Sequence, residues 1–388
     1  MRVLLVANYE PDRQESMRRY ADWLERVLQA RGHEVDVAAP RAFFSRLASG
    51  PGFKKYLGYL DKFVLFPPYL RRQALTYDLV HVVDHSNSMY LRTVCQKPHL
   101  ITCHDVLAIR AARCEFSQVS IGWSGRILQN WILSGLRQAP HVLCVSAKTA
   151  NDLKVLIGDT GKTDTKTHQL LVVPNALNWT FSPEVPLASG VISRLGLKAG
   201  DPYFLHVGGN QWYKNREGVL RIFARLVERS AFSDAKLIMA GKPWTAVMRD
   251  VLRNERVADR VVEAVEVSNE ELQALYGNAL ALLFPSHEEG FGLPIIEAQA
   301  SGCPVITTRR PPMSEVAGEG AIFVDPGHPQ AAAEAIDLGL ENRERLRAAG
   351  FRNLERFDER AIADQYCALY EAITSSDIAS APNLEVVN

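Results

Sequence analysis

The stretch Phe284-Pro-Ser-His-Glu-Glu-Gly-Phe-Gly-Leu-Pro-Ile-Ile-Glu-Ala-Gln-Ala-Ser-Gly302 decides the fold. The apolar run 281–285 predicts a buried strand, which is followed by a loop with two glycines. Pro294 stands in the first turn of a predicted helix, and Gly302 stands where that helix would end. A strand, a glycine loop and a helix in this order predict a site for an anion such as a diphosphate, because a helix N-terminus attracts negative charge.

Two carboxylates flank the glycine loop. Glu289 precedes it, and Glu297 lies one turn into the predicted helix. Neither carboxylate suits a phosphate, so we expect both to contact neutral hydroxyl groups, such as those of a sugar and a ribose. The amide groups of Phe291, Gly292 and Leu293 would face the anion instead.

Short apolar runs alternate with helical patterns on both sides of this stretch. The runs are 2–7, 34–38, 79–83, 99–103, 141–145 and 170–173 in the first half, and 203–207, 236–240, 261–265, 281–285, 304–307 and 321–324 in the second. Their length and β-branched content are typical of strands in parallel sheets covered by helices. Two consecutive series of this kind predict an α/β protein with two doubly wound domains.

The least regular stretch between the two series is 175–200, which contains Pro183, Pro186 and Gly190. We place the linker there. The expected domains are therefore 1–185 and 186–358, followed by a last amphipathic helix over 359–375.

The composition is that of an ordinary globular protein. The chain has 388 residues, of which 47% are hydrophobic and 23% charged, which excludes collagen-like, coiled-coil and disordered classes. Lysine and arginine together number 44, as do aspartate and glutamate, so the formal charge is zero and nothing favours a nucleic-acid partner. No apolar run approaches the ~18–20 residues of a membrane span. The six cysteines form no CxxC pair, which is typical of a reduced, cytoplasmic protein.

The two glutamates, with seven residues between them and a Gly-Phe-Gly-Leu-Pro segment inside, resemble the signature of the family 4 retaining glycosyltransferases of the GT-B fold. The stretch 205–215, Leu-His-Val-Gly-Gly-Asn-Gln-Trp-Tyr-Lys-Asn, resembles the first strand and loop of that family's donor domain. Further segments match in order, namely 102–105, 145–146, 173–175, 236–241, 311–316 and 320–326. The resemblance implies two Rossmann-like domains facing a central cleft, with the last helix crossing back to the first domain.

The resemblance also implies an activity, which is the retaining transfer of a hexose from a nucleotide-sugar, such as a UDP-sugar or GDP-mannose. The acceptor would be a glycan, a lipid-linked sugar or a small molecule, as in polysaccharide biosynthesis. The nucleotide-sugar is a co-substrate, and no cofactor is expected. No Asp-x-Asp triplet occurs in the chain, which argues against a metal holding the diphosphate.

The roles of individual residues follow from the same resemblance. Glu289 would align the donor sugar, Lys214 would neutralise the diphosphate, and His104 would lie across the cleft near the sugar. Glu297 would hold the ribose. The implied donor-binding residues are Lys214, Asn215, Gly208, Gly209, Gly290, Phe291, Gly292, Leu293 and Glu297.

The first-strand loop departs from the family pattern. Residues 8–16 lack the glycine pair that members usually carry there, so Asn8 and Arg13 are the acceptor-side candidates. A nucleotide-sugar epimerase, a phosphorylase of the same fold and a non-catalytic glycosyltransferase-like scaffold remain alternatives. His81 and His85 around Asp84 suggest a metal site, but packing at strand ends is the simpler interpretation.

Segment 41–72 combines basic and aromatic residues. It holds seven basic residues against the acidic Asp61, a net charge of 7 − 1 = +6, with eight phenylalanine and tyrosine residues interleaved. This mixture suits an anionic membrane surface. The alternative is that the aromatic residues pack on their own domain while the charges face water. We therefore expect a cytoplasmic protein. Peripheral contact of 41–72 with the cytosolic face of a membrane is a further prediction, beside the alternative that the aromatic residues pack on their own domain.

Overall fold

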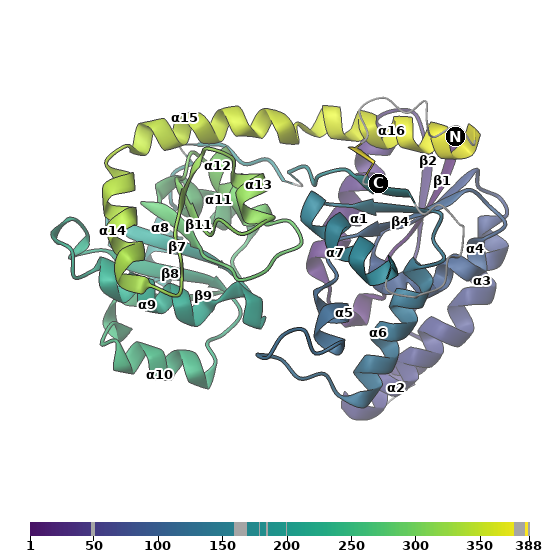
Figure 1. Ribbon diagram of the computed structural model, residues 1–388, viewed down its shortest axis with the longest axis horizontal. Coiled ribbons are helices and arrows are strands. Elements are labelled where there is room, and N and C mark those ends of the chain that lie inside the picture. Colours follow the sequence, from purple (N-terminus) through teal and green to yellow (C-terminus); the bar gives the residue numbers. More distant parts are fainter. Residues whose placement is uncertain are drawn as a thin grey trace. The chain divides into compact units, whose positions relative to one another are not determined.

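The structure is a computed structural model that describes residues 1–47, 51–158, 169–177, 179–183, 185–198, 200–375 and 385–386, without the side chains of 47, 51–55 and 385–386. The chain divides into two compact units (Figure 1). The first comprises Met1–Asn178 and Glu359–Asn388, and the second comprises Trp179–Asp358. The domain limits expected from the sequence, 1–185, 186–358 and 359–375, stay predictions, because this division into two units does not test them.

The first unit is built on a sheet with the strand order β13-β6-β5-β4-β3-β1-β2. Its strands are β1 (Arg2–Val6), β2 (Glu34–Ala38), β3 (Leu79–Val82), β4 (His99–Cys103), β5 (His141–Cys144), β6 (Gln169–Val172) and β13 (Glu385–Val386). All neighbours pair in parallel except β13, which runs antiparallel to β6. Because β1 lies between β2 and β3, the chain changes direction across the sheet at β1, which makes the β1/β3 edge a topological switch point.

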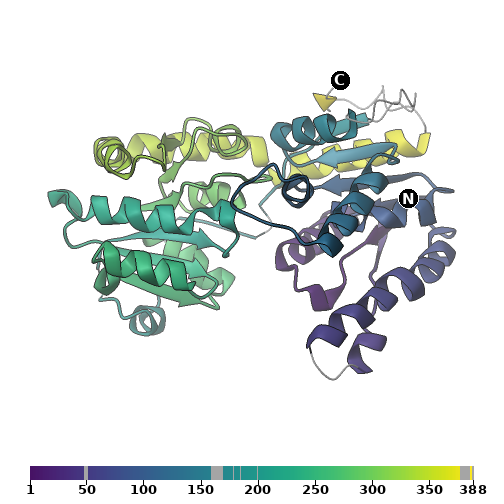
Figure 2. The same cartoon turned by 60° about the horizontal axis from the view of Figure 1, so that its bottom comes forward.

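Helices flank this sheet on both faces (Figure 2). They are α1 (Glu15–Gln29), α2 (Pro51–Leu60), α3 (Phe66–Ala74), α4 (Leu91–Val94), α5 (Leu107–Ala112), α6 (Trp123–Leu136), α7 (Ala147–Gly158) and α16 (Glu359–Ser375). A π-helical turn, η3 (Asp61–Leu65), joins α2 to α3.

The second unit has a parallel sheet with the order β12-β11-β10-β7-β8-β9. Its strands are β7 (Tyr203–Gly208), β8 (Lys236–Gly241), β9 (Val261–Val265), β10 (Ala281–Phe284), β11 (Val305–Thr307) and β12 (Ala321–Phe323). Its helices are α8 (Ser189–Arg194), α9 (Arg216–Leu226), α10 (Ala246–Asn254), α11 (Asn269–Asn278), α12 (Leu293–Ala300), α13 (Met313–Ala317), α14 (Pro329–Leu340) and α15 (Arg343–Asn353). Here the switch point lies between β7 and β10.

The predicted α/β class with two doubly wound sheets is confirmed. Every strand predicted from the apolar runs is present, with ends within one residue of the expected ones. β13 has no counterpart in the prediction.

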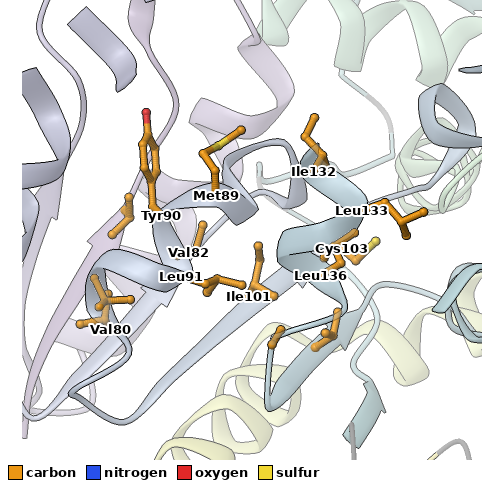
Figure 3. Packing of buried hydrophobic residues seen from close by; sticks show 14 of the residues in the cluster. Val80, Val82, Met89, Tyr90, Leu91, Ile101, Cys103, Ile132, Leu133 and Leu136 are labelled. Atoms are coloured by element: carbon orange, nitrogen blue, oxygen red, sulfur yellow. The ribbon is translucent and has the colours of Figure 1, made fainter. Parts of the chain in front are cut away.

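The core of the first unit shows why these runs become strands. Val82 of β3 and Ile101 of β4 are completely buried, and the inner face of α6 covers them with Ile132, Leu133 and Leu136 (Figure 3). Helices cover the sheet on both faces, so a central strand is buried at successive positions and mostly apolar, rather than apolar at alternate positions.

A buried network of hydroxyl and imidazole groups ties α16 to the first unit. His81 of β3 lies with Nδ1 2.6 Å from the hydroxyl of Tyr370 and with Nε2 2.7 Å from Oγ1 of Thr102. The hydroxyl of Tyr20 lies 3.0 Å from the same Thr102 atom and 2.6 Å from the hydroxyl of Tyr366. The network joins α1, β3, β4 and α16 without a carboxylate, and burial lowers the pKa of His81 to about 3.

We expect this network to make the first unit sensitive to acid. The pKa of His81 is about 3 in the folded state and 6.5 when unperturbed, so above pH 6.5 neither state binds the proton. Between these values only the unfolded chain gains it, and the free energy of unfolding falls as the pH is lowered, by at most about 1.4 kcal/mol per pH unit from this histidine. His81→Asn should therefore lose less stability than the wild type between pH 7.5 and pH 5 in urea unfolding. An unchanged loss would contradict this origin of the acid sensitivity.

Candidate active site

The loops at the switch point of the second unit bring the predicted donor residues together. β7 and β10 are hydrogen-bonded neighbours, with Phe204 beside Ala281 and Leu205 beside Leu282. The loop after β7 leads to Lys214, and the loop after β10 carries Glu289. The amide of His287 donates to the carbonyl of Tyr213 over 2.7 Å, which fastens the two loops to each other.

Lys214 and Glu289 form an ion pair in which both carboxylate oxygens are used. The ammonium Nζ lies 2.8 Å from Oε1 and 2.9 Å from Oε2. The side chains are only 16% and 7% exposed, so water screens the pair less than a surface pair. The ammonium also lies 5.2 Å from the centre of the Phe284 ring, at the end of β10.

Asn215 explains how the backbone positions Lys214. Lys214 ends a single 3-10 turn, Trp212–Lys214, and Asn215 follows in the left-handed conformation with φ +52°. Asparagine tolerates this conformation better than most residues. Its side-chain amide donates to the carbonyl of Pro285 over 2.9 Å, so the turn that carries Lys214 is fixed to the end of β10.

Glycines let the ends of β7 and β8 approach each other. Gly241 has φ +141°, and a Cβ added there would lie 2.1 Å from the carbonyl oxygen of Gly208. A Cβ on Gly208 would itself lie 3.3 Å from Nε2 of His206 and 3.5 Å from Cδ of Lys214. The side chain of Lys214 therefore passes within van der Waals distance of the space beside Gly208, and Gly209 follows in the same loop.

The N-terminus of α12 supplies a second positive element. Gly292 has φ +104° and precedes the first helical residue, Leu293, and no side chain of the described residues caps this end. The preceding Phe291 is buried and packs edge-on against Phe357 at 5.7 Å. Gly290 belongs to the same loop, which leads from Glu289 into the helix. The positive end of the helix dipole thus lies directly after the Glu289 loop.

Glu297 lies one turn into α12 and is buried. Its Oε2 accepts a hydrogen bond from the hydroxyl of Tyr276 in α11 over 2.9 Å. Burial and then the charge of Glu297 raise the pKa of Tyr276 well above its usual value, so the hydroxyl keeps its proton. The tyrosine fixes one carboxylate oxygen of Glu297.

Arg216 adds a buried cation at the start of α9. Its Nη1 donates to the side-chain oxygen of Asn210 and, over 2.8 Å, to the carbonyl of Lys242, while Nε and Nη2 have no partner among the described residues. His206, buried nearby, donates from Nδ1 to the carbonyl of Leu283 over 2.9 Å. Burial, helped by the charges of Arg216 and Lys214, lowers the pKa of His206 to about 3, so this imidazole is neutral. His206 lies in the stretch 205–215 that resembles the family's donor loop, but no role was predicted for it.

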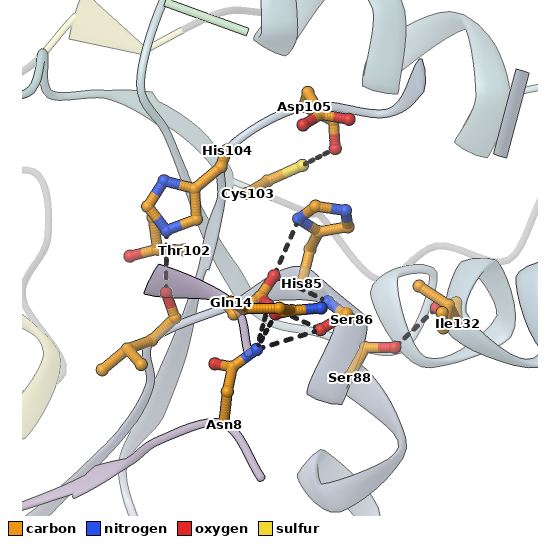
Figure 4. Close-up of polar contacts among 12 residues, drawn as sticks. Asn8, Gln14, His85, Ser86, Ser88, Thr102, Cys103, His104, Asp105 and Ile132 are labelled. Atoms are coloured by element: carbon orange, nitrogen blue, oxygen red, sulfur yellow. Dashed lines mark hydrogen bonds and ion pairs between the residues drawn. The ribbon is translucent and has the colours of Figure 1, made fainter. Parts of the chain in front are cut away.

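In the first unit, His104 follows β4 at the carboxyl edge of the sheet (Figure 4). Its Nε2 donates to the carbonyl of Val83 over 2.9 Å, and the ring of Tyr20 meets it edge-on at 4.7 Å. Burial lowers the pKa of His104 and outweighs the opposing effect of Asp84, so the ring is neutral and carries its lone pair on Nδ1.

Asp84, Asn8 and His85 form a polar cluster at the β1/β3 switch point. Figure 4 shows Asn8 and His85 of this cluster. Asp84 accepts hydrogen bonds from the Asn8 amide and from both the backbone and the hydroxyl of Ser86. His85 Nδ1 lies 3.1 Å from the Asp84 carboxylate. Burial disfavours protonation of His85, but the Asp84 charge outweighs it and raises the histidine pKa.

The other acceptor-side candidate, Arg13, behaves differently. It is exposed, it has φ +50° after the turn Glu10–Asp12, and no described side chain contacts its guanidinium. The structure therefore brings Asn8 into the polar cluster and leaves Arg13 on the surface. Among the described residues, no group of three or more histidine, cysteine, aspartate or glutamate side chains is arranged to hold a metal ion.

Comparison with known proteins identifies the family. Two Rossmann-like units with a glycine loop at a switch point define the class of GT-B proteins. Residues 192–356 match the family model described as glycosyl transferases group 1, and residues 17–175 match the model described as glycosyltransferase family 4. The chain belongs to family 4 of the GT-B glycosyltransferases, and it is a glycosyltransferase.

Similar proteins occur in bacteria. The D-inositol 3-phosphate glycosyltransferase of Corynebacterium diphtheriae is 26% identical over 320 residues, which is 79% of this chain and 73% of the relative. The O-antigen chain mannosyltransferase RfbU of Salmonella typhimurium is 35% identical over 142 residues, which is 36% of this chain and 38% of that protein.

Solved structures show the same fold at lower identity. Sucrose-phosphate synthase from Thermosynechococcus elongatus superposes with a TM-score of 0.73 at 20% identity, over 97% of this chain and all of the other. HepE from Anabaena, solved in complex with UDP and glucose, superposes with a TM-score of 0.65 at 16% identity, over 96% of this chain and 100% of its own.

We expect Gly241→Ala to destabilise the second unit strongly, because the new Cβ would meet the backbone oxygen of Gly208. The control is Gly196→Ala, where φ is +61° but nothing lies within 4 Å of the added atom. Backbone strain alone should cost the control about 1 kcal/mol of unfolding free energy, and the collision should bring the loss at Gly241 to about 3 kcal/mol. Urea unfolding measures both. Equal losses would show that β8 can move away from Gly208 at no cost.

Proposed function

We propose that this protein transfers a hexose from a nucleotide-sugar to a carbohydrate or lipid-linked acceptor, with retention of the anomeric configuration and without a metal ion. The observation that carries the proposal is the pair of Lys214 and Glu289, held at the β7/β10 switch point immediately before the N-terminus of α12. In doubly wound sheets, ligands bind at this point.

The positive groups suit the diphosphate of the donor. Lys214, Arg216 and the N-terminus of α12 all lie on the loops after β7 and β10, so they can stabilise the charge that develops on the leaving diphosphate. Fixed cations and dipoles of this kind take the place of a metal ion. The complex of HepE with UDP and glucose supports a nucleoside diphosphate as the leaving group.

Binding of the donor must change the hydrogen bonds of the ion pair between Lys214 and Glu289. With the nucleotide bound, Lys214 turns part of its hydrogen bonding toward the diphosphate, and Glu289 becomes able to accept from hydroxyls of the sugar. The bond between the anomeric carbon and the diphosphate oxygen breaks, and the acceptor oxygen bonds to the same face of that carbon. The acceptor proton passes to the leaving phosphate, so no protein nucleophile is required.

The acceptor belongs to the first unit in this proposal. The cluster of Asn8, Asp84 and His85 lies at the β1/β3 switch point, and His104 presents a neutral imidazole at the same edge of the sheet. These groups suit the hydroxyls of an acceptor. We propose further that 41–72 contacts an anionic membrane, which would supply a lipid-linked acceptor. Within the described part of the chain, no helix is long and apolar enough to cross a membrane.

A thermal-shift panel with UDP, GDP, ADP, CDP and dTDP, each with and without EDTA, tests the donor site. One nucleotide should stabilise the protein by about 2.7 kcal/mol at a hundred times its Kd, with no effect of EDTA. Lys214→Gln should weaken that nucleotide about tenfold to a hundredfold, because a charge-assisted hydrogen bond is lost, but should leave the free nucleoside unaffected. Lys236→Gln removes another partly buried lysine–carboxylate pair, with Asp201, and should not change binding. Protection that requires a metal would contradict the proposal.

Glu289→Gln tests the transfer itself. The amide keeps the size of the side chain but loses the charge that aligns the sugar, so we expect kcat to fall at least about tenfold while the nucleotide-induced thermal shift remains. Glu228→Gln, at an exposed pair with Arg225, is the matched control. The anomeric configuration of the product, read by NMR, decides retention. An epimerised donor, or phosphorolysis of a disaccharide, would favour another reaction of the same fold.

A further inference from the structure

Helix α6 carries an apolar stripe on its outer face. Trp123, Ile127 and Trp131 follow each other at intervals of four residues and are 79%, 50% and 38% exposed. The inner face of the same helix is also apolar and packs on the core through Ile132 and Leu136. One buried apolar face is enough to attach a surface helix to its domain, so the second stripe is not needed to hold α6 on the sheet.

A similar stripe runs along α2 and the π-helical turn η3. Tyr56, Leu60 and Val64 repeat at the same spacing and are 70%, 40% and 57% exposed. Within this segment Phe63 packs against the core of the first unit, and the chain continues into α3, whose Phe66 and Leu70 are buried in that core.

The two stripes are joined. The rings of Phe63 in η3 and Trp131 in α6 lie 4.8 Å apart, and the ring of Tyr59 stacks on Phe63 at 5.6 Å. Figure 1 shows α2, α3 and α6 in the same part of the first unit. We call the combined surface the docking face, made of Tyr56, Leu60, Val64, Trp123, Ile127 and Trp131.

The two segments that carry the docking face are poor in acidic residues, although Asp12 from the loop after β1 pairs with Lys62 of η3 over 2.9 Å. Asp61 is the only acidic residue of 41–75, and it is 1% exposed because it turns inward to accept from the hydroxyl of Tyr9 over 2.8 Å and from the amide of Phe44 over 2.8 Å. Residues 116–138, which include α6, contain no acidic residue at all. The exposed Arg71, Arg72 and Arg126 therefore set the charge of this surface.

We infer that the docking face lies in the interfacial layer of an anionic lipid bilayer. Tryptophan and tyrosine are the side chains enriched at the membrane–water interface, and arginine binds anionic headgroups. A second copy of the chain is a poorer occupant, because a two-fold contact through this face would bring the same arginines against each other. The inference builds on the proposed membrane contact of 41–72, adds α6 to it, and favours a lipid-linked acceptor over a soluble one.

Vesicle flotation tests the inference with the full chain. We expect binding to vesicles of phosphatidylcholine with phosphatidylglycerol, weaker binding to phosphatidylcholine alone, and a decrease with added salt. The double variant Trp123→Ser, Ile127→Ser should lower the partition coefficient at least about tenfold, because two large apolar side chains no longer enter the interface. The matched control is Val155→Ser, a 72% exposed residue of α7 in the same unit, which should bind like the wild type.

A charge variant separates the two parts of the surface. Arg71→Gln with Arg72→Gln should weaken binding about fivefold for each charge removed, and only on anionic vesicles. If this variant is weakened while the α6 variant binds like the wild type, α6 does not touch the membrane and the inference is overturned, although the contact of 41–72 stands. A wild-type dimer that the α6 variant dissociates would assign the face to a second copy instead. The nucleotide-induced thermal shift, measured on each variant, should be unchanged, so a failure at the membrane is distinguishable from a failure of the donor site.

Discussion

The close approach of β7 to its two neighbours is the constraint on which the candidate donor site depends. β7 pairs with β8 on one side and with β10 on the other. The chain forms β8 and β9 first and then crosses to the other side of β7 to form β10. The loops after β7 and β10 therefore emerge side by side, and the hydrogen bond from His287 to Tyr213 joins them. Because Gly241 has no side chain, the end of β8 can lie against Gly208. The ion pair of Lys214 with Glu289 is thus a consequence of strand order, which brings the two loops together.

The same geometry recurs in the first unit with different chemistry. At its switch point the side chains are Asn8, Asp84 and His85, and the buried carboxylate is matched by amide, hydroxyl and imidazole donors rather than by a lysine. An anionic ligand would meet Asp84 there. The proposed function therefore assigns the diphosphate to the second unit and a hydroxyl-rich acceptor to the first, so one topology used twice would give a donor side and an acceptor side.

Much of this was predictable from sequence, for identifiable reasons. Strands covered on both faces are continuous apolar runs, so all twelve strands of the two parallel sheets could be found, whereas the two-residue β13, Glu385–Val386, carries no such signal. Glu289 and Glu297 were singled out by their spacing around glycines and Lys214 by the resemblance of 205–215 to the family's donor loop, and their roles stay predictions. The pairing of Lys214 with Glu289 was not predicted, because 75 residues separate them and only the register of β7 with β10 brings them together.

The surface of α6 shows what sequence periodicity could not predict, namely which of two apolar helix faces is buried. Trp123, Ile127 and Trp131 have the spacing of a buried helix face, and periodicity alone assigns such a face to the core. A fourteen-residue helix with two apolar faces can bury only one of them against a single sheet, and Ile132, Leu133 and Leu136 already occupy that position. The choice between the faces is made by packing, which no local pattern encodes. The sequence does show that residues 116–138 contain no acidic residue. On the neighbouring segment 41–75, the one acidic residue, Asp61, is turned inward toward Tyr9. Folding alone does not require these two segments to be poor in acidic residues, and the proposed contact with an anionic bilayer offers a reason for it.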